Sequence, residues 1–566
     1  MGNAGGARGW WALVLVWLLG FGLPASLRLP VTRPSEMRYV EAARQMDVSG
    51  SWAVPVMHGE VYAEKPPLWF WATIAGQRLT GDYVHGARLV SVASCTIGAL
   101  ATARLAATLF GPGVVAPLAG ALLSTSVMLI DRAYRPLIDP LLFGLCTLAL
   151  WGLVRAAALS RWRRVLPIVV AALALSAAVL TKGPVGVLAV LLGAITIGWA
   201  WRGRRGVSWL AIALALATAT GIGLGWLAWA SGEVGSWYWD RMLFGQVATR
   251  VAHGAAHEEP WWFYLPSVLV HWLPWTVLLP GAVLLAVDRD RSEAQGAGRG
   301  ALLWVGLGLL VFSLFSGKRT GYLMPFYPGL ALATAWAVVR AETGPPVAER
   351  WIGWPLAAAR WLYPVAAAVF ALGALATALL QAGLGQRLPR LARAWAEGLP
   401  ASAPIAPVLA AIAFGVLAVR EHRDAEPRGR LARRTLRLAL AVALGAGTVL
   451  WTFLPPLARR DDPAPALREI AAALGDHTDP VFYGRRLSYA WSYQTGRLRA
   501  EVLETPEQLA QRLDAPGALQ VVTRGRDWRR LPDAVRARLE ERGRWPVGSG
   551  IVWLVERESS PGDGGR

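Results

Sequence analysis

The side chains best suited to chemistry in this chain are seven ionisable residues that lie far apart in an apolar sequence. They are Glu36, Glu64, Lys65, Asp139, Lys182, His257 and Lys318. A carboxylate can accept a proton from a hydroxyl group, carboxylate and imidazole groups can bind zinc, and ammonium groups can neutralise an anion. Ionisable residues in a membrane are costly and usually functional. We therefore expect a candidate active site if the fold brings these residues together.

Composition indicates the elements that must position them. Of the 566 residues, 55% are hydrophobic and 17% are charged, against roughly 25% charged residues in soluble domains. The run from Val207 to Ala230 is uncharged and long enough to cross a hydrocarbon layer of about 30 Å. The formal charge of +20 comes largely from arginines in short loops between such runs, which favours topology determinants over nucleic-acid binding.

Hydropathy predicts a polytopic α-helical membrane protein with about thirteen transmembrane helices. The predicted spans start near Trp10, Val84, Val114, Leu141, Val165, Val185, Val207, Tyr264, Ala301, Tyr322, Trp361, Pro404 and Leu436. Arginine-rich loops at 161–164, 202–205 and 420–437 fall on one side, which we expect to be cytoplasmic. The N-terminus is then cytoplasmic, and two large outer loops cover residues 28–83 and 231–262.

The predicted domains are a transmembrane domain over residues 1–457 and a soluble extracytoplasmic domain over residues 458–566. Strand-like pieces (PVFYG, LQVVT and GIVWLVE) alternate with charged, helical stretches such as Ala464 to Leu474 and Thr505 to Leu513. This alternation predicts a small C-terminal α/β domain. Its three tyrosines, Tyr483, Tyr489 and Tyr493, are expected to pack in the core of the domain.

The first outer loop is expected to begin with a helix whose apolar side carries Tyr39, Ala43 and Met46. Such a helix is able to lie along the membrane surface. Ser35 is a plausible N-cap, and Glu36 falls in the first turn, where an acidic residue is favoured for structural reasons alone. Helix capping is therefore the alternative to a chemical role for these two residues.

The strings SEMRYVEAARQM, SGSW and EKPPLWFW of this loop resemble the first loop of the bacterial aminoarabinose transferases and of the wider protein-mannosyltransferase-like family (glycosyltransferase family 39). Further matches follow in the order of the family. They are Leu137 to Pro140, Leu180 to Gly183, Arg250 with His257 and Pro260 to Trp262, and Phe315 to Lys318 with Tyr322. The resemblance covers about the first three-fifths of the chain.

The resemblance implies a membrane glycosyltransferase of the GT-C type in the bacterial inner membrane. Such an enzyme takes a sugar from a polyprenyl-phosphate carrier and transfers it to lipid A, a protein or another glycan at the outer face. Membrane lipids are then partners and nucleic acid is not, and neither a nucleotide nor a redox cofactor is expected. Two alternatives stay open: an inactive member that binds the carrier as a subunit, and a transporter of polyprenyl-linked sugar.

Within that reaction the cations have a physical role, because fixed positive charge stabilises the negative charge that develops on a departing phosphate. The candidate phosphate-binding cations are Lys65, Lys182, Arg250 and Lys318. The candidate aromatic groups are Tyr39, Tyr62 and Tyr322. Their hydroxyl groups are expected to bind phosphate or line the entry groove of the carrier, and simple core packing is an equal reading.

Glu36 and Asp139 are the candidate bases for the acceptor hydroxyl. The first loop of the family usually begins with an Asp-Glu pair, whereas this chain has Ser35 and Glu36. Serine is no base at neutral pH without an activating partner. Either Glu36 or Asp139 takes this role, or the protein is impaired, and we favour Glu36. Arg132 and Arg135 are expected either to steer anionic lipid or to pair with Asp139, and pairing makes Asp139 a poorer base.

The resemblance also implies a divalent metal, zinc or a similar ion, near the glutamate of the Glu-Lys-Pro motif and a histidine of the later outer loop. These positions correspond to Glu64 and His257. Two ligands do not by themselves specify a metal, and a complete site needs further ligands or waters. The sequence therefore leaves open whether a metal binds and which metal it is.

Overall fold

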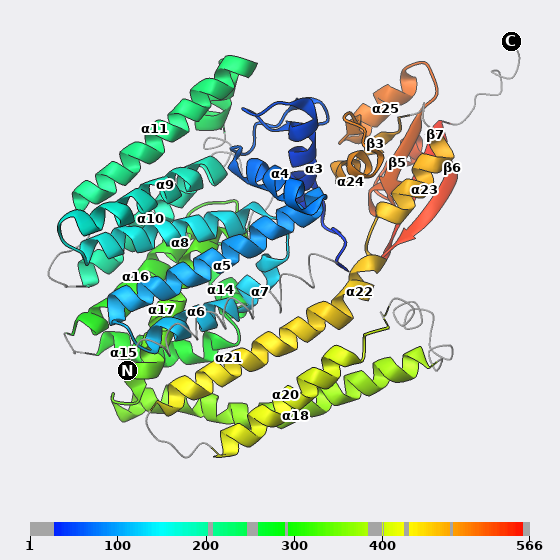
Figure 1. The fold of residues 1–566 in the computed structure, drawn as a ribbon. Coiled ribbons are helices and arrows are strands. Elements are labelled where there is room, and N and C mark those ends of the chain that lie inside the picture. Colours follow the sequence, from blue (N-terminus) through cyan, green and yellow to red (C-terminus); the bar gives the residue numbers. More distant parts are fainter. Residues whose placement is uncertain are drawn as a thin grey trace, which may run out of the picture.

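A computed structural model describes residues 28–201, 208–245, 259–288, 292–382, 399, 401–423, 429–475 and 479–557. Long helices form a bundle, and a small domain built around a sheet lies at one end of it (Figure 1). The chain is a multi-pass membrane protein. The predicted helical membrane fold with a small C-terminal α/β domain is thus confirmed.

Within the described ranges, nine helices are long and apolar enough to cross a membrane, and two bent pairs raise this number to eleven. The elements of the bundle are α5 (Tyr83–Phe110), α6 (Val115–Ser124), α7 (Val127–Ala133), α8 (Ile138–Ala157), η2 (Arg161–Arg164), α9 (Val165–Lys182), α10 (Pro184–Ala200), α11 (Trp209–Val234), α12 (Trp237–Asp240), η3 (Arg241–Gly245), α14 (Tyr264–His271), η4 (Trp275–Leu278), α15 (Leu279–Val287), α16 (Glu293–Ser313), η5 (Thr320–Phe326), α17 (Tyr327–Ala341), α18 (Pro346–Gln381), α20 (Ile405–Arg423), α21 (Arg430–Thr448), η7 (Val449–Phe453) and α22 (Leu454–Arg460). Every predicted span from Val84 onward matches a helix or a bent pair. The span predicted near Trp10 lies outside the described residues.

The two bent pairs are α6 with α7, bent by 60°, and α14 with the segment Trp275–Val287, bent by 104°. In the first pair the chain breaks at Ser126, whose hydroxyl accepts a hydrogen bond from the backbone N–H of Leu129. In the second pair the break contains Pro274, which has no N–H to donate to a helix. Hydropathy counts each pair as one span because a bend leaves the apolar composition unchanged.

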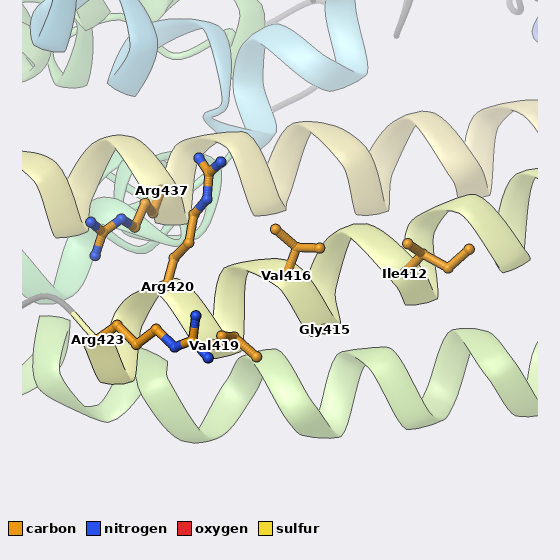
Figure 2. Close-up of a pocket in the computed structure, with 7 residues that line it drawn as sticks. All are labelled: Ile412, Gly415, Val416, Val419, Arg420, Arg423 and Arg437. Carbon is orange, nitrogen blue, oxygen red and sulfur yellow. The ribbon is translucent and has the colours of Figure 1, made fainter.

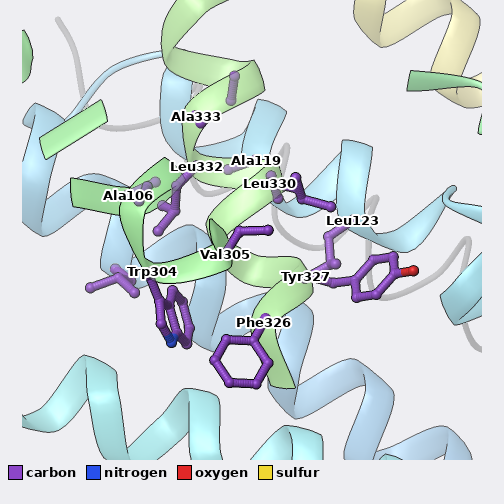
Figure 3. Packing of buried hydrophobic residues seen from close by; sticks show 14 of the residues in the cluster. Ala106, Ala119, Leu123, Trp304, Val305, Phe326, Tyr327, Leu330, Leu332 and Ala333 are labelled. Carbon is purple, nitrogen blue, oxygen red and sulfur yellow. The ribbon is translucent and has the colours of Figure 1, made fainter. Parts of the chain in front are cut away.

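The segment Thr320–Ala341, which comprises η5 and α17, lies at the centre of the bundle, because 89% of its most apolar 18 residues are buried, against 17% in α18. Figure 3 shows side chains of α17 packed with those of α16 and α6. Gly329 permits this close approach, because a Cβ atom there would lie 2.8 Å from the carbonyl oxygen of Ala301. The rings of Trp304 and Phe326 lie 5.8 Å apart. This packing fixes η5, the turn that leads into α17.

The outer faces of the bundle are apolar. Leu372 on α18 is 65% exposed, and Leu409 on α20 is 62% exposed. Large exposed apolar surfaces are a liability in water, whereas lipid tails solvate them. These faces therefore belong in the hydrocarbon layer, as expected for a multi-pass membrane protein.

The first outer loop forms a compact layer at one end of the bundle. Its elements are α3 (Pro34–Ser49), β1 (Val56–Met57), β2 (Glu60–Val61) and α4 (Leu68–Thr80). Tyr39, Ala43 and Met46 are buried, as predicted. Helix α3 packs between α4 and helix α24 (Arg485–Thr495) of the C-terminal domain (Figure 1), and its expected place along the membrane surface stays a prediction.

The prediction that Ser35 is the N-cap of α3 is wrong. The cap is Arg33, which makes no side-chain capping bond, and Pro34 is the first helical residue. Proline favours this first position because its fixed φ suits a helix and its missing N–H needs no partner there. Ser35 therefore lies inside the first turn.

The C-terminal domain has a five-stranded sheet in the order β4-β3-β5-β7-β6. Its elements are α23 (Ala464–Leu474), β3 (Val481–Tyr483), α24 (Arg485–Thr495), β4 (Val502–Leu503), α25 (Pro506–Asp514), β5 (Gln520–Arg524), α26 (Gly525–Trp528), α27 (Asp533–Arg536), β6 (Leu539–Val547) and β7 (Gly550–Arg557). Strand β3 is parallel to β4 and β5, whereas β7 is antiparallel to β5 and β6. The three predicted strand-like pieces coincide with β3, β5 and β7 to within one or two residues. The domain boundary after residue 457 stays a prediction.

Candidate active site

The described candidate residues lie at the end of the bundle that carries the C-terminal domain. Helix α5 leaves the first outer loop and the α6–α7 pair returns, so the start of α8 lies beside α3 and α4. Trp69, just after the Glu-Lys-Pro motif, donates a hydrogen bond from Nε1 to the carbonyl oxygen of Leu137 at 2.8 Å. Leu137 and Ile138 share a hydrophobic cluster with Tyr39 and Trp69. The predicted convergence of the first loop with Asp139 is therefore present.

Asp139 and Lys182 form an ion pair. Asp139 lies in the first turn of α8, and Lys182 is the last residue of α9. The Lys182 Nζ donates to Asp139 Oδ1, and the two side chains are 10% and 18% exposed, respectively. Sequence reasoning considered Arg132 and Arg135 as partners of Asp139, and the direct partner is instead Lys182. Because the carboxylate of Asp139 is paired with the ammonium group of Lys182, Asp139 is better suited to orienting Lys182 than to acting as a free base.

The turn η5 closes over this ion pair. The Lys182 Nζ lies 4.5 Å from the centre of the Tyr322 ring, within the range of a cation–π contact. A Cβ atom on Gly321 would lie 2.7 Å from Asp139 Oδ2, so only glycine allows the backbone to come this close. Three predicted residues from three separate segments thus meet: Asp139, Lys182 and Tyr322.

Glu36 is buried beside a guanidinium group. Its carboxylate lies 3.5 Å from Nη1 of Arg135, and only 6% of the residue is exposed. Burial raises the pKa of Glu36, although Arg135, Arg33 and Arg88 favour its ionised form. A general base works best when its pKa approaches the operating pH. The environment of Glu36 therefore suits a base better than that of a carboxylate in open water.

A chain of polar contacts joins Glu36 to η5. Arg135 pairs with Asp131 at 2.5 Å, and Asp131 also lies 3.3 Å from Nε of Arg132. The Nη2 of Arg132 donates a hydrogen bond to Oγ1 of Thr320 at 2.8 Å. This chain of contacts runs from Glu36 on α3 through the region of α7 to η5, the turn that also covers the Asp139–Lys182 pair.

Buried arginine donors without hydrogen-bond acceptors cluster in this region. Among the described residues, Nε of Arg38, Arg88 and Arg135 makes no hydrogen bond. A buried donor left unsatisfied costs about 1–3 kcal/mol, and more when it is charged. An anion that accepted from these groups would relieve that cost.

Glu64 lies in the loop between β2 and α4. Its carboxylate accepts hydrogen bonds from Arg38 Nη1 at 3.3 Å and from the Tyr62 hydroxyl at 2.9 Å, and Lys65 Nζ donates to its carbonyl oxygen. Burial opposes the charged form of Glu64, but Arg38, Tyr62 and Lys65 outweigh it and lower its pKa. The guanidinium of Arg38 also lies 5.1 Å from the centre of the Tyr39 ring. Tyr39, Tyr62, Glu64 and Lys65 thus form one cluster around Arg38.

The second large outer loop contacts the candidate residue Lys318. Lys318 is buried, and its Nζ donates to the carbonyl oxygen of Glu259 at 2.8 Å. Arg250 and His257 lie outside the described residues. Their predicted roles in phosphate and metal binding stay predictions.

The metal also stays a prediction. In the part of the chain that the structure describes, no group of three or more His, Cys, Asp or Glu residues is close enough to hold an ion. The Glu64 carboxylate already accepts from Arg38 and Tyr62, and a cationic group beside a carboxylate weakens it as a metal ligand. The described residues alone do not form a metal centre.

The C-terminal domain contacts the first loop through residues that sequence reasoning assigned to its core. The Tyr489 ring stacks on His58 at 5.6 Å, and the Tyr493 hydroxyl donates to Asp82 at 2.8 Å. Tyr483 does pack within the domain. Tyr489 and Tyr493 pack in a hydrophobic cluster that the domain shares with the first loop. The core prediction missed this shared face, because a local strand and helix pattern does not show which face meets another domain.

Comparisons with known proteins show to which family the chain belongs. The model of the dolichyl-phosphate-mannose-protein mannosyltransferase family matches residues 11–237. An undecaprenyl phosphate-alpha-4-amino-4-deoxy-L-arabinose arabinosyl transferase of Pseudomonas aeruginosa (strain UCBPP-PA14) is 33% identical over 390 residues, which are 67% of each chain. The chain belongs to this family of arabinosyl transferases. A family member of the same name from Erwinia tasmaniensis is 33% identical over 327 residues, 57% of this chain and 58% of the relative.

The matched region spans 58% of the length of one of these relatives and 67% of the other. The crystal structure of ArnT from Cupriavidus metallidurans bound to undecaprenyl phosphate resembles the whole chain, with a TM-score of 0.70, 19% identity and 99% coverage of both chains. The apo structure of that protein gives a TM-score of 0.68 at 20% identity. This likeness extends the family fold to the C-terminal domain.

Proposed function

We propose that this family member is a glycosyltransferase that moves 4-amino-4-deoxy-L-arabinose from undecaprenyl phosphate to an acceptor at the outer face of the bacterial inner membrane. The names of its relatives support this donor. One observation carries the proposal for this chain: carboxylates and cations from the first loop, α7, α8, α9 and η5 meet at one end of the bundle.

The cations of this site are the proposed phosphate-binding groups. Lys182 is held by Asp139 beside Tyr322, and the buried arginines offer donors that lack acceptors. A phosphate oxygen would accept hydrogen bonds from these groups, which are strong when both partners are charged. The same cations stabilise the charge on the carrier phosphate as it leaves. Lys65, Arg250 and Lys318 are proposed to help from the neighbouring loops.

Glu36 is the proposed base. The acceptor hydroxyl oxygen attacks the anomeric carbon of the sugar, the bond from that carbon to the phosphate oxygen breaks, and the hydroxyl proton passes to Glu36. The products are the glycosylated acceptor and undecaprenyl phosphate. The raised pKa of Glu36 supports this assignment, and the ion pair of Asp139 with Lys182 makes Asp139 a positioning group.

We propose that the end with the C-terminal domain faces the periplasm and that the N-terminus is cytoplasmic. The arginine-rich segment 161–164 and the arginines at the start of α21 lie at the other end, as expected for cytoplasmic loops. The acceptor enters from the aqueous side beside α24. Lipid A, a protein and another glycan remain the candidate acceptors.

The experiment compares the wild-type chain with Glu36→Gln and Asp139→Asn in proteoliposomes that contain the sugar-linked undecaprenyl phosphate donor. Mass spectrometry of cells with and without each variant follows both the donor and the glycosylated outer-surface products. Loss of product with accumulation of donor supports the proposal. Wild-type product levels in both variants contradict the catalytic assignment. Movement of the donor between leaflets without formation of product indicates a transporter. Glu233→Gln is the matched control, because Glu233 lies at the same end on α11 and its carboxylate accepts a hydrogen bond from Nε1 of Trp229 at 2.9 Å.

A further inference from the structure

A groove with a volume of about 680 Å³ lies between α20 and α21, apart from the candidate active site (Figure 2). Its lining residues are Ile412, Gly415, Val416, Val419, Arg420, Arg423 and Arg437. Figure 1 shows α21 running from the far end of the bundle to the C-terminal domain. Because Arg437 and Arg423 lie near that far end of their helices, the cationic end of the groove points away from the C-terminal domain.

One face of α20 forms the floor of the groove. Its lining residues are spaced by three or four positions, so they follow one side of the helix. Ile412, Val416 and Val419 are 59%, 48% and 50% exposed. Gly415 opens a gap among them, because a Cβ atom there would meet nothing within 4 Å. The groove therefore has an apolar floor that can receive a chain of methylene groups.

The length of the groove along α20 matches the thickness of one lipid leaflet. Eleven residues separate Ile412 from Arg423, which corresponds to about 16 Å at a rise of 1.5 Å per residue. Half of a hydrocarbon layer of about 30 Å is about 15 Å. An acyl chain that starts at the level of Arg423 would thus end near Ile412.

The cationic end of the groove carries arginines and a buried glutamate that is already paired. Buried Glu421 pairs with Arg434 at 2.5 Å and with Arg437 at 2.9 Å. Within the described ranges, Arg420 and Arg423 have no acidic partner. Both are exposed and lie three residues apart on α20. In Figure 2 the Arg420 side chain is directed toward α21, and the Arg423 side chain lies toward the opposite side of α20. Two guanidinium groups that flank the groove in this way can bind a phosphate from two sides.

We propose that this groove binds one anionic phospholipid from the leaflet at the arginine end. The phosphate lies between Arg420 and Arg423, and one acyl chain follows the apolar floor toward Ile412. This site is separate from the donor site, which lies at the other end of the bundle. The bound lipid would cover the seam between α20 and α21.

A membrane protein carries arginines on its cytoplasmic side for topology alone, so the test must separate a built site from general charge. The chain is purified and placed in nanodiscs that contain phosphatidylglycerol and phosphatidylcholine with the same acyl chains. Native mass spectrometry then measures retained lipid. The double variant Arg420→Gln with Arg423→Gln is expected to lose phosphatidylglycerol by at least about fivefold per arginine, the factor that corresponds to about 1 kcal/mol.

Two matched controls define the site. Arg161→Gln with Arg163→Gln removes the same charge from η2 on the same side, and it should retain phosphatidylglycerol within about twofold of wild type. Gly415→Leu fills the groove and should lower retention, whereas Gly306→Leu adds the same side chain to an open position on α16 and should not. The proposal is overturned by equal losses in the two arginine double variants, by unchanged retention in Gly415→Leu, or by displacement of the phospholipid by undecaprenyl phosphate.

Discussion

The Arg135 guanidinium lies 3.5 Å from the Glu36 carboxylate and thereby joins the segment after α7 to the first turn of α3. The other side of the same guanidinium contacts Asp131 at 2.5 Å. Arg135 thus holds Glu36 in a cationic setting while burial favours the neutral acid. The outcome of this competition is a raised pKa for Glu36.

Glu36→Gln is expected to lower kcat by about 10²–10⁴-fold, the usual contribution of a general base, while binding of the carrier persists. In the wild type, kcat/KM should fall as the pH drops through the pKa of Glu36, because the protonated acid cannot accept a proton. Since the pKa is raised, this acid limb should lie above pH 4.5, the ordinary value. The check is a pH profile of sugar transfer beside a carrier-binding assay. A wild-type profile that is flat down to pH 4.5 would contradict the assignment.

Gly321→Ala is expected to lower sugar transfer at least about tenfold without unfolding the chain. The new Cβ would lie 2.7 Å from Asp139 Oδ2 and must displace the carboxylate from its pair with Lys182. Gly317→Ala is the control in the same loop, because a Cβ there meets nothing within 4 Å. Initial rates and melting curves of both variants provide the measurement. Equal rates in the two variants would show that the position of Asp139 does not matter for transfer.

Asp139→Asn is expected to destabilise the chain by about 3–5 kcal/mol, because it leaves the Lys182 ammonium group buried without its counter-ion. Lys182→Met alone should cost a similar amount. The double variant should cost clearly less than the two single changes together, since it removes both charges. Thermal unfolding in detergent measures all three. Strict additivity would mean that the pair is not coupled in the folded protein.

Docking of the C-terminal domain on the first loop should weaken at acidic pH. Burial, followed by the charge of Arg485, lowers the pKa of His58 from 6.5 to about 4. The unfolded or undocked segment therefore takes up a proton first as the pH falls below 6.5, and the stabilisation is lost between about pH 6.5 and 4. The loss should be on the order of 2 kcal/mol, less than the shift alone implies because the ring is partly exposed.

Hydrogen exchange of residues 485–495 as a function of pH measures this docking. The matched variant is His58→Asn, since asparagine tolerates the left-handed backbone at this position, where φ is 55°. The variant should dock with little dependence on pH between 4 and 6.5. A wild-type exchange pattern that is constant over this range would exclude the His58 contact as a pH-sensitive element.

Much of the fold followed from the sequence. The apolar runs that start near Val84 and Leu141 became α5 and α8, because a helix is the structure that satisfies its own backbone hydrogen bonds in lipid. The strands β3, β5 and β7 followed from short hydrophobic runs between turns. The cap of α3 was predicted wrongly because Pro34 outweighs Ser35 at the start of the helix.

The sequence by itself determined the membrane class, the spans, the small C-terminal α/β domain and the motifs of the family, since composition and local periodicity carry this information. Only the tertiary structure decided which charges meet. Asp139 pairs with Lys182 rather than with an arginine four to seven residues away, and Tyr489 stacks on His58 of the first loop as well as packing with its own domain. These partners are separated by tens to hundreds of residues, and their contact depends on how helices pack in three dimensions.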